Sequence, residues 1–131
     1  MIMRIPLLAA LLTVTVPAIA AAQSIARGQY IVERVGLCHD CHTPRDEKGQ
    51  LIIGQGLQGA PIGFRPLHPM PFATEAPALA GLPGHYTPEQ MAVFLQTGKR
   101  PDGSTPLPPM PPYRLNREDA LAVTAYLKSL K

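Results

Sequence analysis

The chain has 131 residues, a formal net charge of +3 and two cysteines. This length suits one domain, and a weak positive charge without a basic block argues against nucleic-acid binding. Sixteen prolines and eleven glycines, with only 5% aromatic residues, indicate long loops and a thin apolar core to which a buried cofactor would add.

The first 22 residues have the pattern of a signal peptide. Arg4 forms a short basic region, residues 5–19 are uncharged and mostly apolar, and three alanines precede the predicted cleavage before Gln23. A retained membrane anchor is the alternative, but the apolar run is short for a bilayer and is bracketed by prolines. The sequence therefore predicts export to the periplasm, a mature domain over 23–131 and no membrane span after cleavage.

The first helix of this domain is predicted over residues 24–35. Apolar residues recur there at helical spacing, and Ser24 is a candidate N-cap. Gly28 lowers helix propensity by about 1 kcal/mol relative to alanine, which suggests that another helix approaches closely at this point.

The second helix is predicted over residues 88–97. Thr87 and Gln90 have the spacing of a capping box, Pro88 suits the first helical position, and Gly98 is placed to end the helix.

The third helix is predicted over residues 117–130, with Asn116 as its N-cap. The segments 43–86 and 99–115 are rich in proline and glycine and show no sustained alternation, so no strand is predicted in them. The expected class is all-α, with long loops that need something to organise them.

The motif that carries chemistry is Cys38-His39-Asp40-Cys41-His42. The spacing C-x-x-C-H is that of c-type haem attachment. Cysteines three residues apart on a helical turn project to the same side, so both thiols can reach the two vinyl groups of one haem. The motif thus predicts one covalently bound haem c, attached through Cys38 and Cys41, with His42 as an axial ligand of the iron.

Three other interpretations of the motif explain it less well than haem attachment. A Cys38–Cys41 disulfide would close a very small loop and leave His42 unexplained. A thioredoxin-like redox pair needs a βαβ context that the sequence lacks. A zinc site needs further ligands at a paired spacing, which the four histidines do not supply; they are His39, His42, His68 and His85.

The mature chain resembles the class I cytochrome c family, and in particular the cytochrome subunits of bacterial periplasmic dehydrogenases. The residues that carry the resemblance are Arg27-Gly28-Gln29-Tyr30, the motif followed by Thr43-Pro44, Gly98 with Asp102-Gly103, Met110-Pro111, and the final segment with Glu118-Asp119 and Ala125-Tyr126-Leu127.

This resemblance implies a small fold of about three to five helices around one haem, in which the N- and C-terminal helices cross. Gly28, Tyr30 and Tyr126 stand where that crossing would be made. It also implies His42 as the proximal ligand, with a carbonyl near Pro44 accepting its Nδ1–H. The Leu51 to Leu82 region departs from the family by its length and its prolines.

The second axial ligand is predicted to be Met110. Met110 and Met70 both lie in proline-flanked loops, where fixed φ angles reduce the entropy lost when a thioether is held against iron. Met110 is favoured because it shortly precedes the last helix, as the family's ligand does. Met91 is expected in the core, and His/His ligation through His68 is a minor alternative.

The haem propionates have four candidate partners that the sequence does not rank: Arg65, Lys99, Arg100 and Tyr113. The predicted function is that of an electron carrier, not an enzyme, working between a dehydrogenase and a cytochrome or oxidase, either free or as a dehydrogenase subunit. The alternative is a five-coordinate haem enzyme or gas sensor in which Met110 is not bonded.

Overall fold

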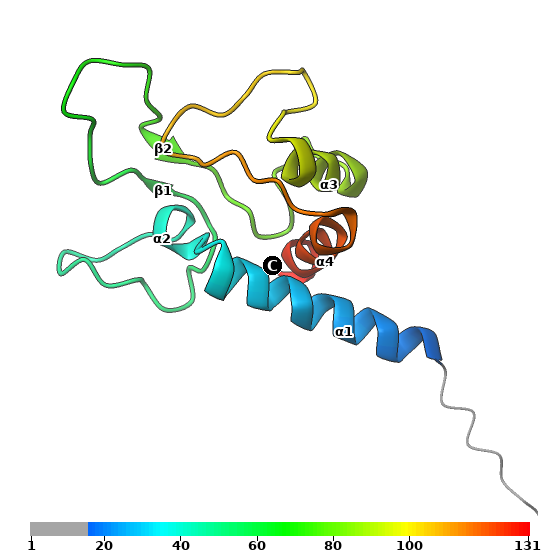
Figure 1. The fold of residues 1–131 in the computed structure, drawn as a ribbon. Coiled ribbons are helices and arrows are strands. Elements are labelled where there is room, and N and C mark those ends of the chain that lie inside the picture. Colours follow the sequence, from blue (N-terminus) through cyan, green and yellow to red (C-terminus); the bar gives the residue numbers. More distant parts are fainter. Residues whose placement is uncertain (1–15) are drawn as a thin grey trace, which may run out of the picture.

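The computed structural model of the chain describes residues 16–131. In chain order its elements are α1 (Val16–Tyr30), the π-helical turn η1 (Ile31–Val35), α2 (His39–His42), β1 (Ala60–Pro61), β2 (Glu75–Ala76), α3 (Pro88–Thr97) and α4 (Arg117–Ser129). Figure 1 shows the three long helices on one side and the loops that join them gathered on the other.

The helix α1 is longer at its N-terminus than the sequence predicted. It begins at Val16, inside the predicted signal peptide, whose first 15 residues lie outside the described part of the chain. Ser24 is therefore an interior residue of the helix, and its prediction as the N-cap is wrong; the alanines before it are the best helix formers. No helix within residues 16–131 is long and apolar enough to cross a bilayer.

The crossing of α1 and α4 forms the centre of the fold (Figure 1). A Cβ on Gly28 would overlap the backbone carbonyl of Ala122 and lie 2.8 Å from the Cβ of Tyr126, which explains the glycine and confirms the predicted close approach. Tyr126 is buried and donates a hydrogen bond to Glu33 over 3.1 Å. Tyr30 is 54% exposed, so its place in this contact stays a prediction.

The ends of α3 are formed as predicted. Thr87 accepts a hydrogen bond from the backbone N–H of Gln90, whose side chain accepts one from the Thr87 N–H, so the capping box is complete. Gly98 ends the helix in the left-handed region with φ of 70°.

The N-terminus of α4 is also capped as predicted, by the side chain of Asn116, which accepts from the N–H of Asp119. Both α1 and α3 pack against α4, so α4 lies at the centre of the core.

The loops contain little regular structure, which confirms the all-α class with long loops. The strands β1 and β2 form one antiparallel pair of two residues each, which the sequence did not predict. Fully buried Leu57 anchors the long loop: its N–H donates to the hydroxyl of Thr43, and its carbonyl accepts from the N–H of Leu79. The long loop is thereby fastened beside α2.

Candidate functional site

An apolar cavity of about 490 Å³ lies between α2, the loops and the faces of α3 and α4. This volume falls within the range of about 300–1,000 Å³ that is usual for small-molecule and cofactor pockets. Its lining includes all four residues that the sequence singled out for the site, together with buried side chains of both helices: Cys38, Cys41, His42, Met110, Met91, Phe94, Leu95, Val123 and Leu127.

The two cysteines enter the cavity from the short helix α2 and the residue before it. The turn is held by backbone hydrogen bonds from Cys38 to the Val32 carbonyl, 3.0 Å, and from His42 to the Cys38 carbonyl, 2.9 Å. Both thiols are free, so they form no disulfide. Burial raises the pKa of the Cys38 thiol to about 11, because an apolar environment disfavours the charged thiolate.

The imidazole of His42 is buried, and a single hydrogen bond fixes its tautomer. Its Nδ1 lies 2.7 Å from the carbonyl oxygen of Pro77. Because a carbonyl only accepts, Nδ1 carries the proton and Nε2 keeps its lone pair, the form that binds a metal. Burial also lowers the pKa of His42, which favours the neutral ring, although the Pro77 contact partly opposes this.

The carbonyl that orients His42 is not the one that the sequence suggested. The resemblance placed it near Pro44, whereas the structure places it at Pro77, 35 residues after the histidine. The prediction is wrong because the long loop after α2 brings the residue that follows β2, Pro77, to the imidazole. A contact closed by so long a loop leaves no signal in the local spacing.

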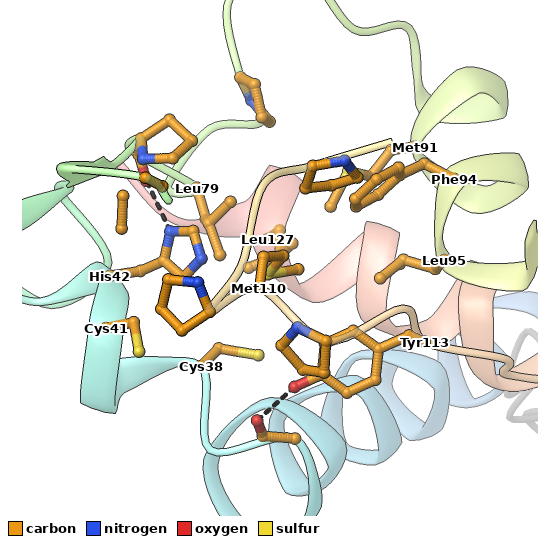
Figure 2. A pocket seen from close by; sticks show the side chains of 18 of the residues that line it. Cys38, Cys41, His42, Leu79, Met91, Phe94, Leu95, Met110, Tyr113 and Leu127 are labelled. Atoms are coloured by element: carbon orange, nitrogen blue, oxygen red, sulfur yellow. Dashed lines mark hydrogen bonds between the residues drawn. The ribbon is translucent and has the colours of Figure 1, made fainter. Parts of the chain in front are cut away.

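The three methionines of the described chain have different surroundings. Met110 is partly buried and lines the cavity from the loop that precedes α4, as Figure 2 shows. Met70 is 51% exposed and is not part of the lining. Met91 is buried on α3, as expected of a core residue, and its side chain also reaches the cavity.

Only two of the four candidate partners of the haem propionates line the cavity. Arg100 and Tyr113 line it, while Arg65 and Lys99 do not. The hydroxyl of Tyr113 is already used, because it donates to the carbonyl of Gly36 (Figure 2). Arg100 also donates to the carbonyl of Thr105, which places its guanidinium beside the loop that carries Met110.

The other histidines do not assemble a second site. His68 is exposed and lies outside the cavity lining, which removes support for His/His ligation through it. Within residues 16–131, no group of three or more histidine, cysteine or acidic side chains is arranged to hold a metal ion, so the zinc alternative has no ligand set there.

Sequence reasoning missed two residues of this site. One is Pro77, whose backbone carbonyl orients His42, and the other is Tyr113 in its actual role, a contact with the segment before the cysteines. A backbone carbonyl carries no residue-type signal. The sequence offered Tyr113 as a candidate partner of a haem propionate. Its actual hydrogen-bond partner, Gly36, lies 77 residues away in the sequence.

Two free thiols three residues apart, a neutral histidine beside them and an apolar cavity fit a haem attached through thioether bonds. The fold and the site thus define a small helical haem protein of the c type. The family model for cytochrome c matches residues 25–131, and the chain belongs to the cytochrome c family. Its cofactor is haem c, and its role is haem-based electron transfer. No curated protein matches the chain.

Proposed function

We propose that this protein is a periplasmic carrier of single electrons, with one haem c bound to Cys38 and Cys41 and with His42 and Met110 as the axial ligands. The observation that carries this proposal is that all four side chains line one apolar cavity. They come from two segments that are far apart in the sequence. Three belong to the segment around α2, and Met110 belongs to the loop before α4.

The chain's residues hold and tune the cofactor. Cys38 and Cys41 would hold the haem through thioether bonds, each formed by addition of the thiol S–H across a vinyl C=C, with sulfur bonded to one carbon and the hydrogen to the other. The Pro77 carbonyl accepts the Nδ1–H of His42, which would leave Nε2 to bind the iron, and this hydrogen bond raises the basicity of the ring. When bound, the haem would supply the one-electron ferric–ferrous chemistry that the carrier needs.

The thioether of Met110 is proposed as the sixth ligand because it completes the coordination without an open position. His/Met ligation raises the reduction potential of a cytochrome c, which suits an electron carrier. Arg100, the candidate at the cavity whose guanidinium carries a permanent charge, is proposed as the partner of a propionate.

The proposed partners are redox proteins: a dehydrogenase as the donor, and a cytochrome or oxidase as the acceptor. This part of the proposal rests on the signal-peptide pattern of residues 1–22 and on the resemblance to dehydrogenase cytochrome subunits. Reconstitution with candidate dehydrogenases would show whether the protein accepts their electrons free or as a bound subunit.

The ligation is tested by comparing Met110→Ala with Met70→Ala, in protein made by a host with working cytochrome maturation. The ferric parent should show the weak far-red absorbance band of a methionine–iron bond, and its ferrous form should not bind carbon monoxide readily. Met110→Ala should lose the band and bind carbon monoxide, whereas Met70→Ala should match the parent because its side chain is exposed and outside the cavity.

Two results would contradict the proposal. Rapid carbon monoxide binding by the unmodified protein would indicate a five-coordinate haem, which suits an enzyme or gas sensor. Loss of the band in Met70→Ala alone would assign the ligand to the other methionine.

A further inference from the structure

The side chain of Tyr113 joins two parts of the chain. One is the loop of residues 105–115, the Met110 loop, and the other is residues 36–42, the attachment segment, which carries the cysteines. We propose that Tyr113 is a positioning residue: its hydroxyl ties the Met110 loop to the attachment segment and so limits how fast Met110 leaves the iron. This inference rests on the proposed His42/Met110 ligation.

The contact is short and involves the attachment segment directly. The Tyr113 hydroxyl donates to the carbonyl of Gly36 over 2.5 Å. A Cβ on Gly36 would lie 3.3 Å from the Cys38 sulfur and 3.4 Å from the Tyr113 oxygen. Gly36, Cys38 and Tyr113 are therefore close neighbours, and a side chain larger than glycine at position 36 would crowd the other two. Figure 2 shows the tyrosine reaching from the loop across to the cysteine-bearing side of the cavity.

The Met110 loop has few backbone donors of its own. Five of its residues are prolines, at 106, 108, 109, 111 and 112, and proline has no N–H to donate. The N–H of Met110 is used within the loop, at 3.3 Å from the carbonyl of Leu107. A segment of this composition must be held largely by its carbonyls and side chains.

Two backbone hydrogen bonds hold the Met110 loop to other parts of the fold. The Pro108 carbonyl accepts from the N–H of Ala73, 2.7 Å, and the N–H of Leu115 donates to the carbonyl of Leu95, 3.1 Å. Neither partner belongs to the attachment segment. Among the hydrogen bonds of residues 16–131, the one from Tyr113 is the bond that joins the loop to that segment.

The consequence concerns movement of the methionine. Tyr113 follows Met110 by three residues, with two stiff prolines between them, so the loop can carry Met110 away from the cavity only if Tyr113 moves too. That movement breaks the bond to Gly36. Removing the hydroxyl should therefore speed the departure of Met110 by about two- to tenfold, the change that one net hydrogen bond corresponds to.

The test is the rate of methionine displacement in the ferric holoprotein, for the parent and for Tyr113→Phe. Imidazole is added in increasing excess, and the loss of the far-red band is followed by stopped flow. At saturating imidazole the rate no longer depends on its concentration and equals the rate at which Met110 leaves the iron. Tyr113→Phe should reach a limiting rate about two- to tenfold higher than the parent.

Tyr126→Phe is the matched control. It also removes one phenolic hydrogen bond, from Tyr126 on α4 to the carboxylate of Glu33 in η1, and Tyr126 lies outside the cavity lining. Denaturant unfolding of both variants measures how much stability each loses. If Tyr113 only stabilised the fold, variants that lose equal free energies of unfolding would displace methionine at equal limiting rates. Tyr113→Phe and Tyr126→Phe would then not differ.

The outcomes separate this inference from the proposed function. A limiting rate that is raised in Tyr113→Phe and unchanged in Tyr126→Phe supports the proposal that the Tyr113 hydroxyl slows the departure of Met110. Equal limiting rates in Tyr113→Phe and the parent overturn it and leave the Met110 ligation intact. A parent protein without the far-red band overturns the ligation itself, and the inference falls with it.

Discussion

The two walls of the cavity are built by different means. On one side, Cys41 and His42 belong to the short helix α2, with Cys38 at its N-cap, and local backbone hydrogen bonds close this turn. On the other side, Met110 belongs to a proline-rich loop held by a few contacts with distant parts of the chain. Figure 1 shows the same contrast between the helices and the loops.

This difference indicates where the protein is stable and where it opens. Local unfolding favours segments with few buried contacts and few protected hydrogen bonds, whereas packed helices open only at a cost near that of global unfolding. We therefore expect substitutions in the helical frame, meaning α1, α2 and α4, to affect haem attachment and the free energy of unfolding. Changes in the Met110 loop should instead affect ligand exchange.

The largest effect should come from removing the attachment itself. The double variant Cys38→Ala, Cys41→Ala should carry no covalent haem, because the described chain has no other thiol. Mass spectrometry of the denatured protein measures this as loss of the whole mass of one haem. Asp40→Ala is the control, since that side chain is exposed and should leave attachment complete. Covalent haem in the double variant would refute the assignment of the cysteines.

A smaller effect should come from the crossing of α1 and α4. In Gly28→Ala the new methyl group overlaps backbone atoms of Ala122, which no side-chain rotation relieves. Overpacking costs about 1–3 kcal/mol, and the gain in helix propensity, about 1 kcal/mol, offsets part of it. Denaturant unfolding should therefore show a net loss of up to about 2 kcal/mol of stability.

The matched control for this variant is Gly84→Ala, because a Cβ at Gly84 meets nothing within 4 Å. It should leave stability nearly unchanged. If Gly28→Ala sped up the displacement of Met110 without lowering stability, the division of roles between the helical frame and the loop would be wrong.

The smallest effect should come from the ion pair between α1 and α4. Arg27 donates to Asp119 over 2.8 Å, and this hydrogen bond lowers the pKa of the carboxyl below its usual value of 3.8. Folding therefore favours the ionised carboxylate. Its contribution is fully present above about pH 3.8 and is lost as the pH falls through the lower pKa of the folded state.

Asp119→Asn tests this contribution. Thermal unfolding from pH 7 down to pH 2 should show the variant slightly less stable than the parent at neutral pH, with the difference shrinking below pH 3.8. A difference that stayed constant across this range would show that the charge of Asp119 does not stabilise the fold.

Features that depend on neighbouring residues were predictable. The caps of α3 and α4 follow from side chains three residues apart, and the helical turn of the motif follows from its own spacing. The start of α1 was misplaced because alanines assigned to a cleavage region are also strong helix formers. The choice of Met110 over Met70 rested on its distance from the last helix and stays a prediction; Met110 lines the cavity and Met70 does not.

By itself, the sequence determined the class of the protein, the cofactor, and the residues expected to hold it, because these depend on spacings of a few residues. Tertiary structure decided that Pro77 orients His42, that Arg100 rather than Arg65 or Lys99 reaches the cavity, and that Tyr113 contacts Gly36. The physical reason is that these positions depend on distant parts of the chain: the contacts of His42 and Tyr113 join residues 35 and 77 positions apart. Its partner is selected by how the whole chain packs, and no local pattern records that.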